Sequence, residues 1–264
     1  MLEHITPVLL TYNEAQNIVR TLSRLAWAHD IVVVDSGSTD GTLSALERFP
    51  NVRVFNRSFD THANQWRYAT EATQITTGWI LRLDADYQVS DALITELEQL
   101  KPGTPVNGYV IGFDYAVFSR KLLSSLYPAN AILLRKGYFN LRDNGHTEAW
   151  QVQGPVATLE SRIVHDDWKP ISLWLRSQRR YMQLELESCR VSQTGLVHWL
   201  RLRPPIMPIS VLLYCLFGKG LILNGRAGVF YALQRMVAEA IFSLLLLEEQ
   251  LRNQSDCSKA NYSG

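Results

Sequence analysis

Short apolar runs rich in β-branched residues alternate with helical segments through the first third of the chain, and this alternation constrains the fold most. Residues 5–11 (ITPVLLT) and 31–35 (IVVVD) have the composition of strands that are buried on both faces of a sheet. Between them, Ile18, Leu22 and Leu25 are spaced as one face of a helix. A strand, a helix and a further strand in this order form a right-handed unit with parallel strands. The sequence therefore predicts an α/β fold with a Rossmann-like, mostly parallel sheet and helices on both faces.

Acidic residues stand at the carboxyl ends of two apolar runs. Asp35 closes the run IVVVD, and Asp84 and Asp86 close the run WILRLDADY at 79–87. In open α/β sheets, ligands bind beyond the carboxyl ends of the strands. The three carboxylates are therefore expected to meet at one edge of the sheet and to mark the functional site.

The tripeptide Asp84-Ala85-Asp86, a DXD motif, suits a divalent cation that is also bound to phosphate. Carboxylate oxygens suit Mg²⁺ and Mn²⁺, and phosphate groups often complete the coordination of such ions. One aspartate can face the metal while the other faces a sugar or a ribose. The motif alone is a weak signal, because it recurs by chance, and its position at a strand end is what supports it.

Two turn segments border the same edge of the predicted sheet. After Asp35, which can accept a hydrogen bond from a ring N–H of a base, the small residues Ser36, Gly37 and Ser38 let a ribose or a phosphate approach the backbone. The end of the first strand supplies further candidates for contacts to a nucleotide: Thr11, Tyr12 and Glu14.

Three motifs together resemble glycosyltransferase family 2, whose fold is called GT-A. They are TYNEAQNI at 11–18, VVVDSGSTDGT at 32–42 and WILRLDADY at 79–87. FDTHANQWRYA at 59–69 and GHTEAWQVQGPV at 145–156 are similar to a bacterial branch of the family that makes lipopolysaccharide core or exopolysaccharide.

The resemblance implies an activity and a set of ligands. The expected reaction is an inverting transfer of a sugar from a nucleotide-sugar donor to a glycan or a lipid-linked acceptor, with Mg²⁺ or Mn²⁺ as cofactor. Carried over to this chain, the motifs place Asp35 on the base, Asp84 near the ribose and the sugar, and Asp86 on the metal.

An inverting transfer also needs one general base that takes the proton of the acceptor hydroxyl. The resemblance favours Glu148, because similar proteins carry an acidic residue six positions before the glycine of a Gly-Pro pair, here Gly154. Similar proteins more often have His-Glu there, whereas this chain has His146-Thr147-Glu148. The alternative bases are Asp143, Asp166 and Asp167.

Several other polar and aromatic residues have open roles. His165 ends a predicted strand and could complete the metal site, or be a capping or core residue. Arg135 and Arg142 are candidates for the donor diphosphate or for the surface. Five tryptophans are either core residues or residues that stack on a sugar: Trp66, Trp79, Trp150, Trp168 and Trp174.

The chain is expected to contain two regions. Residues 1–168 form the predicted catalytic domain, in which 108–118 and 150–165 add antiparallel strands at one side of the sheet. Residues 169–264 form a C-terminal helical region. Its last helix, over about 228–250, is predicted to be amphipathic, with an ion pair on its polar side between Arg235 and Glu239. Such a helix either packs on the domain or lies in a membrane interface.

Charge is concentrated in the second region. From Lys169 to Arg226 the chain has nine Lys/Arg and two Asp/Glu, a local charge of +7, although the whole chain has a formal net charge of +1. The basic flank and the amphipathic helix predict peripheral contact with an anionic membrane surface. Nucleic-acid binding is not expected, because the basic residues are interleaved with aliphatic helix faces rather than with exposed aromatic residues.

The N-terminus and the cysteines indicate a compartment. The chain begins MLEHITPVLL, without a basic segment before a long apolar core, and its three cysteines are widely spaced. We therefore expect a cytoplasmic protein at the inner face of the plasma membrane.

Two other functions are compatible with the pattern. A nucleotidyltransferase also combines a Rossmann-like sheet with metal-binding carboxylates, but it would carry a glycine-rich, basic loop where this chain has TYNEAQN. A catalytically inactive nucleotide-sugar-binding protein is the second alternative, against which the presence of both Asp84 and Asp86 argues. The sequence does not identify the donor sugar, the nucleotide, the acceptor or the linkage.

Overall fold

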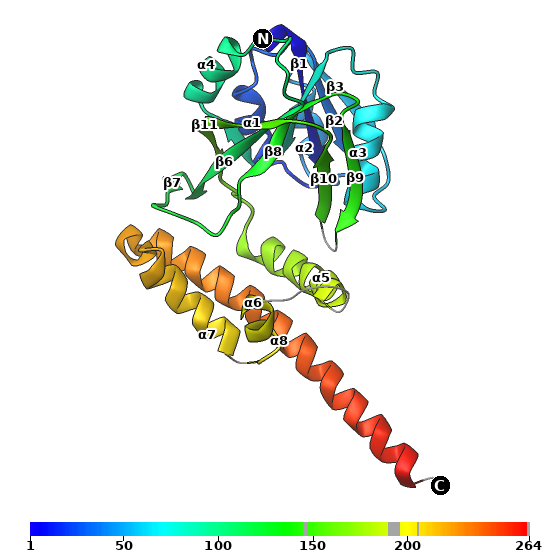
Figure 1. The fold of residues 1–264 in the computed structure, drawn as a ribbon, viewed down its shortest axis with the longest axis vertical. Coiled ribbons are helices and arrows are strands. Elements are labelled where there is room, and N and C mark those ends of the chain that lie inside the picture. Colours follow the sequence, from blue (N-terminus) through cyan, green and yellow to red (C-terminus); the bar gives the residue numbers. More distant parts are fainter. Residues whose placement is uncertain (145–146, 190–195, 205, 263–264) are drawn as a thin grey trace. The chain divides into compact units, whose positions relative to one another are not determined.

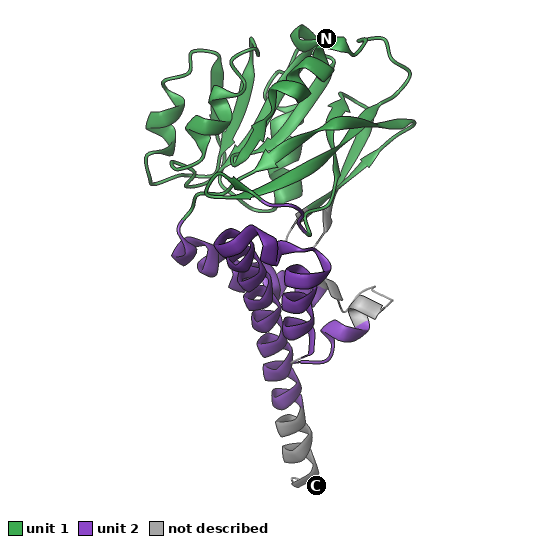
Figure 2. Ribbon diagram, turned by 90° about the vertical axis from the view of Figure 1, so that its left-hand side faces the viewer, with its two compact units in different colours: residues 1–121, 126–169 green, residues 122–125, 170–264 purple. Residues whose placement is uncertain are grey.

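The structure, a computed structural model, describes residues 1–144, 147–189, 196–204 and 206–262. The chain divides into two compact units (Figure 2). Unit 1 comprises Met1–Lys121 and Leu126–Lys169, and unit 2 comprises Leu122–Ser125 and Pro170–Gly264. The segment Leu122–Ser125, which lies between the two parts of unit 1 in the sequence, thus belongs to unit 2.

Unit 1 is built around a mixed β-sheet (Figure 1). Its strands follow the order β3-β2-β1-β4-β8-β6-β11-β5, and β7 pairs with β6. A separate antiparallel ribbon is formed by β9 and β10. The strands are β1 (Ile5–Thr11), β2 (Ile31–Asp35), β3 (Val52–Asn56), β4 (Trp79–Asp84), β5 (Tyr87–Val89), β6 (Gly108–Val117), β7 (Arg120–Lys121), β8 (Asn130–Arg135), β9 (Phe139–Asn144), β10 (Thr147–Val152) and β11 (Val156–His165).

The first half of the sheet is parallel, as the alternation of strands and helices predicts. β1 pairs in parallel with β2 and with β4, and β2 pairs in parallel with β3. Neighbouring residues along a strand enter different cores: Leu9 and Leu81 pack in one cluster, and Val8 and Ile80 pack in another. The strands carry continuous apolar runs because both of their faces are buried.

Helices cover both faces of the sheet, which confirms the predicted α/β fold. One core cluster contains apolar residues of α1 (Ile18–Ser23), α2 (Thr42–Leu46) and α4 (Asp91–Gln99). The other cluster contains residues of α3 (His62–Glu71) and is completed by side chains from the β9–β10 ribbon. A short 3₁₀ helix, η1 (Leu2–His4), precedes β1.

The second half of the sheet differs from the prediction for residues 150–165. The expected single strand is interrupted at Gly154, which has φ +91°, so that β10 belongs to the ribbon and β11 belongs to the sheet. β11 pairs with β6 in parallel, not antiparallel, with Val156 opposite Gly108. The chain between β6 and β11 is long enough for the crossover that a parallel pair requires. The antiparallel pairs here are β4–β8, β6–β8, β6–β7 and β5–β11.

Unit 2 is helical and has a core of its own. Met182 packs in this core with Ala238, Phe242 and Leu246 of the long last helix. The elements are α5 (Ile171–Cys189), α6 (Leu196–Arg201), α7 (Ile206–Leu213), a π-helix η2 (Tyr214–Gly218), a 3₁₀ helix η3 (Leu221–Asn224) and α8 (Gly225–Tyr262).

A buried ion pair connects α6 with α8. The Arg201 guanidinium donates to Glu239 at 2.9 Å and to Glu185 of α5 at 2.6 Å. The carboxylate of Glu239 is buried, so the prediction of a polar outer side with a pair between Arg235 and Glu239 is wrong. The segment does form a helix, α8 (Gly225–Tyr262), but the side of α8 that faces the other helices depends on what packs against it.

Among the described residues, one helical stretch, Leu221–Asn253, is long and apolar enough to cross a membrane by length and composition. The qualifying window has a mean hydropathy of 1.5, and 39% of it is buried inside the protein. Core helices of proteins outside membranes meet the same criterion.

Candidate active site

The carboxyl ends of β1, β2 and β4 lie side by side and bring the predicted residues together. Thr11 is opposite Asp35 in the β1–β2 register, and Leu10 is opposite Asp84 in the β1–β4 register. Asp86 follows Asp84 by two residues. The edge of the sheet that the sequence indicates therefore gathers polar side chains from the ends of three strands.

Asp35 is fully buried and organises the loop after β2. Its Oδ1 accepts from the hydroxyls of Thr11 (2.9 Å) and Ser38 (2.6 Å). Its Oδ2 accepts from the backbone N–H groups of Gly37 (2.9 Å) and Ser38 (2.8 Å), and Gly37 has φ +87°, which a larger residue would adopt only with strain. A carboxylate accepts about four hydrogen bonds, so those of Asp35 are all used within the protein. A base could bind Asp35 only in exchange for one of these bonds, which hold Ser36 and its neighbours in place.

The loops after β1 and β2 are interlocked. The backbone N–H of Asn13 donates to the Ser38 hydroxyl at 2.8 Å, and the N–H of Glu14 donates to the Thr42 hydroxyl at 2.7 Å. Tyr12 lies at the start of the first loop and is 58% exposed. The loops form one surface, with the Tyr12 ring accessible to a ligand.

Asp84 lies near two other carboxylates, those of Asp86 and Glu148. Its side chain is open to solvent, but the surrounding protein atoms and the carboxylates of Asp86 and Glu148 raise its pKa. Arg82, on the same face of β4, has the opposite effect. Three carboxylates with one nearby guanidinium form an arrangement that a bound cation would stabilise.

Asp86 is nearly buried and faces His165, the last residue of β11. Its Oδ2 lies 3.1 Å from Nε2 of His165, and the two side chains are 13% and 12% exposed. Burial opposes the charged form of each residue, yet their attraction lowers the pKa of Asp86 and raises the pKa of His165. His165 is thus placed beside the predicted metal ligand.

Two buried atoms of this pair have no hydrogen-bond partner, namely Asp86 Oδ1 and His165 Nδ1. Buried polar atoms are usually paired, so two unpaired atoms at this position are suited to contact a bound ion. Across the described parts of the chain, no cluster of three or more His, Cys, Asp and Glu side chains is arranged to hold a metal. The residues fit a cation that takes one or two ligands from the protein and the rest from phosphate or water.

Glu148, the predicted base, is held on β10 by two donors. Its Oε1 accepts from Arg82 at 3.0 Å and from the Trp150 indole at 2.9 Å. The Arg82 guanidinium also donates to the carbonyl of Ala131 at 2.7 Å, which fixes its orientation. Because Glu148 raises the pKa of Asp84, its carboxylate lies within electrostatic reach of the strand-end cluster. The side chain of the alternative base Asp143 lies outside the described residues.

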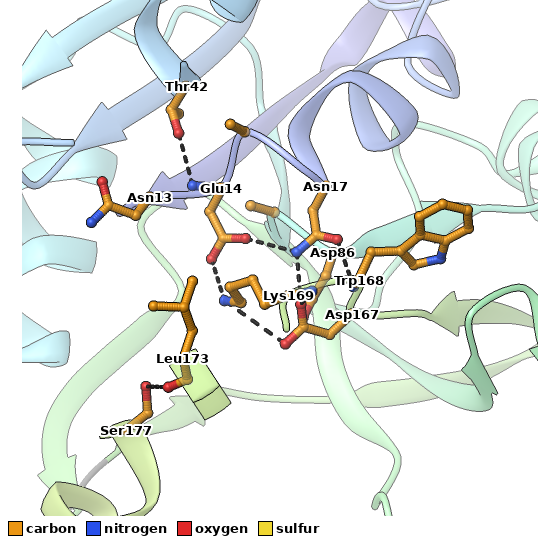
Figure 3. A network of polar contacts seen from close by, with 12 residues as sticks. Asn13, Glu14, Asn17, Thr42, Asp86, Asp167, Trp168, Lys169, Leu173 and Ser177 are labelled. Carbon is orange, nitrogen blue, oxygen red and sulfur yellow. Dashed lines mark hydrogen bonds and ion pairs between the residues drawn. The ribbon is translucent and has the colours of Figure 1, made fainter. Parts of the chain in front are cut away.

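A network around Glu14 was not predicted (Figure 3). Lys169 Nζ donates to Glu14 at 2.7 Å and lies 3.9 Å from Asp167. Asn17 is fully buried and donates to both carboxylates, at 2.9 and 2.8 Å. Burial and the charge of Asp86 raise the pKa of Glu14 to about 7, against the opposing effect of Lys169. Glu14, expected to bind the nucleotide, is therefore engaged with Lys169 in this structure.

The sequence contained a signal for part of this network. β11 ends at the same edge of the sheet as β4, so the strand-end argument that identifies Asp84 also applies to residues 165–169. No spacing pattern identifies Lys169 or Asn17, because the contacts of Lys169 with Glu14 and of Asn17 with Asp167 join residues 155 and 150 positions apart.

Asp166 has a structural role. Its carboxylate accepts from Arg20 and from the Trp168 indole, both at 2.8 Å, and its N–H donates to the carbonyl of Asp86 at 3.1 Å. The Arg20 guanidinium lies 4.4 Å from the ring centroid of Trp168. Of the five tryptophans whose roles were open, Trp168 is the exposed one, at 37%.

Of the two roles that the sequence leaves open for Arg135, contact with a diphosphate does not fit its position. Arg135 is opposite Trp79 in the β4–β8 register, and its guanidinium lies 5.0 Å from the Trp79 ring centroid. Asp84 is five residues further along β4, about 17 Å away at the rise of a strand. Arg142 is exposed on β9.

Comparison with known proteins identifies the family. Residues 7–152, more than half of the chain, match glycosyl transferase family 2. The chain therefore belongs to glycosyltransferase family 2.

The curated relatives are similar over part of their length. An uncharacterized glycosyltransferase of Rickettsia felis is 31% identical over 100 residues, which are 38% of this chain and 34% of that protein. The lipopolysaccharide core biosynthesis glycosyltransferase LpsC of Rhizobium meliloti is 28% identical over 123 residues, 42% and 45% of the two chains. The matched region spans less than half of these relatives.

Solved structures show more distant similarity. S. aureus TarS 1-349 in complex with UDP-GlcNAc has 14% identity and a TM-score of 0.48, with 95% of this chain and 92% of that chain covered. Glucosyl-3-phosphoglycerate synthase from Mycobacterium tuberculosis, in complex with Mn²⁺, UDP and phosphoglyceric acid, has 14% identity and a TM-score of 0.44 over 74% and 81% of the chains.

Proposed function

We propose that the protein is an inverting glycosyltransferase that moves a sugar from a nucleotide-sugar donor to a glycan or a lipid-linked acceptor in bacterial cell-surface polysaccharide synthesis. The observation that carries the proposal is the meeting of Asp35, Asp84 and Asp86 at adjacent strand ends, with Glu148 in electrostatic reach. Membership of glycosyltransferase family 2 and the similarity to LpsC support it.

On the donor side, we assign Asp35 to the base, which replaces one of the four hydrogen bonds that Asp35 accepts within the protein. We assign Asp84 to the ribose and the sugar, and Asp86 to a Mg²⁺ or Mn²⁺ ion. The unpartnered Oδ1 of Asp86 and the adjacent His165 support the metal assignment. When bound, such an ion neutralises the charge that develops on the diphosphate leaving group. The interlocked loops supply the remaining nucleotide contacts: Thr11, Tyr12, Glu14, Ser36, Gly37 and Ser38.

The reaction is a single displacement at the anomeric carbon. The oxygen of the acceptor hydroxyl forms a bond to that carbon while the bond from the carbon to the diphosphate oxygen breaks, so the configuration inverts. Glu148 takes the proton of the hydroxyl. Because Arg82 and Trp150 both donate to Oε1, we assign the proton to Oε2.

The decisive experiment is the substitution Asp86→Ala. We expect transfer to fall by about a thousandfold or more, since metal stabilisation of the leaving group is worth several kcal/mol. Far-UV circular dichroism should be unchanged, and Asp91→Ala, at an 86% exposed side chain on α4, should transfer normally. Undiminished transfer by Asp86→Ala in excess chelator would contradict the proposal.

The donor can be identified by thermal shift with a panel of UDP-, GDP- and dTDP-sugars in the presence of Mn²⁺ or Mg²⁺. A donor that binds the folded state raises the apparent melting temperature by mass action. We expect the shift to depend on the divalent cation and to be lost in Asp86→Ala. A shift that is equal with and without the cation would count against the metal assignment.

The alternatives are less well supported. A nucleotidyltransferase would bind its triphosphate through a basic, glycine-rich loop after β1, where this chain has the interlocked Tyr12–Glu14 turn. An inactive nucleotide-sugar-binding protein would show the thermal shift without turnover. Detection of sugar transfer excludes it.

We also propose peripheral contact with the cytoplasmic face of the membrane. The local charge of +7 between Lys169 and Arg226 supports this location, because anionic lipids attract basic segments. Retention of the protein on anionic vesicles in a flotation assay is the expected result, and an absence of retention would contradict it.

A further inference from the structure

The continuous helical stretch of α7 and η2 has two different faces. Its inner face is buried in unit 2 through Pro208, Val211 and Cys215, which recur at helical spacing. Its outer face is exposed, and it consists of large apolar side chains: Ile206, Ile209, Leu213, Tyr214 and Phe217. We refer to these five residues as the α7 face.

A helix on the surface of a protein in water normally presents polar residues on its outer side. Between Ile206 and Phe217, Ser210 and Tyr214 carry side-chain hydroxyls, and the other side chains are apolar. Phe217 is 64% exposed, and Leu223 of the adjacent η3 is 79% exposed. Large contiguous apolar patches of this kind mark sites of protein or membrane interaction.

The charges around the α7 face favour an anionic partner. Residues 188–238 contain six Lys/Arg and no Asp/Glu. Arg203 and Lys219 flank the stretch, and each lies against an aromatic ring, with Arg203 3.5 Å from the Trp199 centroid and Lys219 5.8 Å from the Tyr214 centroid. Basic residues beside aromatic rings are the combination that anchors proteins in the headgroup region of a bilayer.

Length determines how the stretch can meet a bilayer. Ile206–Gly218 would be about 20 Å long as a helix, shorter than the roughly 30 Å hydrocarbon core of a bilayer. It cannot span, but it can lie in the plane of the interface with its apolar side buried.

We infer that the α7 face is the membrane-contacting surface of this protein, and that its partner is an anionic lipid bilayer. The inference rests on the proposed membrane contact and specifies its surface. The alternative mechanism is insertion of the long helix α8 into the bilayer. We do not favour it, because α8 places Ala238, Phe242 and Leu246 in the core of unit 2.

The test compares two double variants of the full chain in vesicle flotation. Ile209→Asp/Phe217→Asp places two charges on the α7 face. Leu244→Asp/Leu251→Asp places the same charges on α8, at side chains that are equally open, at 67% and 61% exposed. The vesicles are phosphatidylcholine with or without phosphatidylglycerol.

We expect the wild type and the α8 variant to float with phosphatidylglycerol vesicles, and the α7 variant to partition at least tenfold less. Arg203→Gln/Lys219→Gln should lower partitioning by roughly tenfold or more, since each basic residue near an anionic surface contributes about fivefold. The donor-induced thermal shift of each variant verifies that unit 1 is still folded.

Four results would overturn the inference. Equal flotation of the α7 variant and the wild type shows that another surface binds lipid. Loss of flotation in the α8 variant alone shows that α8 inserts. A change from dimer to monomer in sedimentation of the α7 variant, with flotation unchanged, shows that a second copy of the chain covers the face. If the wild type itself does not float, the membrane contact fails, while the transfer activity is tested separately by Asp86→Ala.

Discussion

The aspartates at the strand ends have different surroundings, and their substitution should have different effects. Asp35 accepts four hydrogen bonds from its own loop and from β1, so its removal first disturbs the loop. Asp86 has one buried oxygen without a hydrogen-bond partner, so substitution of Asp86 should first weaken the binding of a ligand. Comparing the unfolding free energy and the transfer activity of the Asp35 and Asp86 variants therefore distinguishes the two roles.

Glu148 is the residue whose role most needs testing. We expect Glu148→Gln to lower kcat about 10²- to 10⁴-fold, the usual contribution of a general base, with little change in donor affinity. Steady-state kinetics and the donor-induced thermal shift measure the two effects. Glu160→Gln, at an exposed position on β11, is the matched control. If the Glu148→Gln protein had a normal kcat, the general base would be Asp167 or Asp143 instead.

Glu14 should make stability depend on pH. Its pKa is raised to about 7 in the folded protein from an ordinary value of 4.5, so the folded state binds the proton more tightly than the unfolded state does. The stability contribution of the protonated group is complete below pH 4.5 and is lost as the pH rises to about 7. A shift of this size corresponds to at most about 3 kcal/mol.

The measurement is urea unfolding of the wild type and of Glu14→Gln at several pH values. Between pH 5 and pH 7 the wild type should lose stability relative to Glu14→Gln, and above that range the difference should be constant. Glu47→Gln, at an exposed position, should follow the wild type. Parallel pH profiles for Glu14→Gln and the wild type would show that Lys169 keeps Glu14 ionised.

At the scale of elements, sequence patterns predict where helices and strands lie along the chain better than they predict which strands pair with one another. The apolar runs of β1, β2 and β4 were recognised because burial on both faces leaves a continuous signal. The sequence patterns do not predict β5, β7, β8 or β9, and they predict the wrong direction for β11. Strand direction depends on which strand is adjacent in the sheet, and no local pattern encodes that neighbour.

The ion pair between α6 and α8 gives a prediction at this scale. Arg201→Met leaves Glu239 buried without its partner, and we expect a loss of about 3–5 kcal/mol in unfolding free energy of unit 2. Arg201→Met/Glu239→Leu should recover much of this loss, because a well-packed apolar pair removes the uncompensated charge. Denaturant unfolding of both variants measures the difference. Equal losses in the single and double variants would show that packing of Arg201 on Phe242 matters more than charge.

For the whole molecule, the two compact units have separate cores, and we propose that each maintains its own structure. Phe242 is fully buried and packs with residues of unit 2. Phe242→Ala should therefore cost about 3–5 kcal/mol in unit 2 while leaving donor binding by unit 1 unchanged. Limited proteolysis and the donor-induced thermal shift report on the two units, and Leu244→Ala, at an exposed position on the same helix, is the control. A loss of donor binding in Phe242→Ala would show that the units depend on each other.

The sequence by itself determined the parallel half of the sheet and the carboxylates at its edge. Asp35, Asp84 and Asp86 follow directly from apolar runs, and parallel strands must bring their carboxyl ends to one edge. Local order along the chain is sufficient for that conclusion.

Only the tertiary structure decided what those carboxylates contact. The pairs Asp86–His165, Glu148–Arg82 and Glu14–Lys169 join residues 79, 66 and 155 positions apart, and each depends on strand order or on a loop crossing. It also decided which side of α7 is exposed, because a helix that is apolar all round does not encode its outward face. Periodicity and composition are local properties, whereas electrostatic pairing and exposure depend on neighbours that only the folded chain brings together.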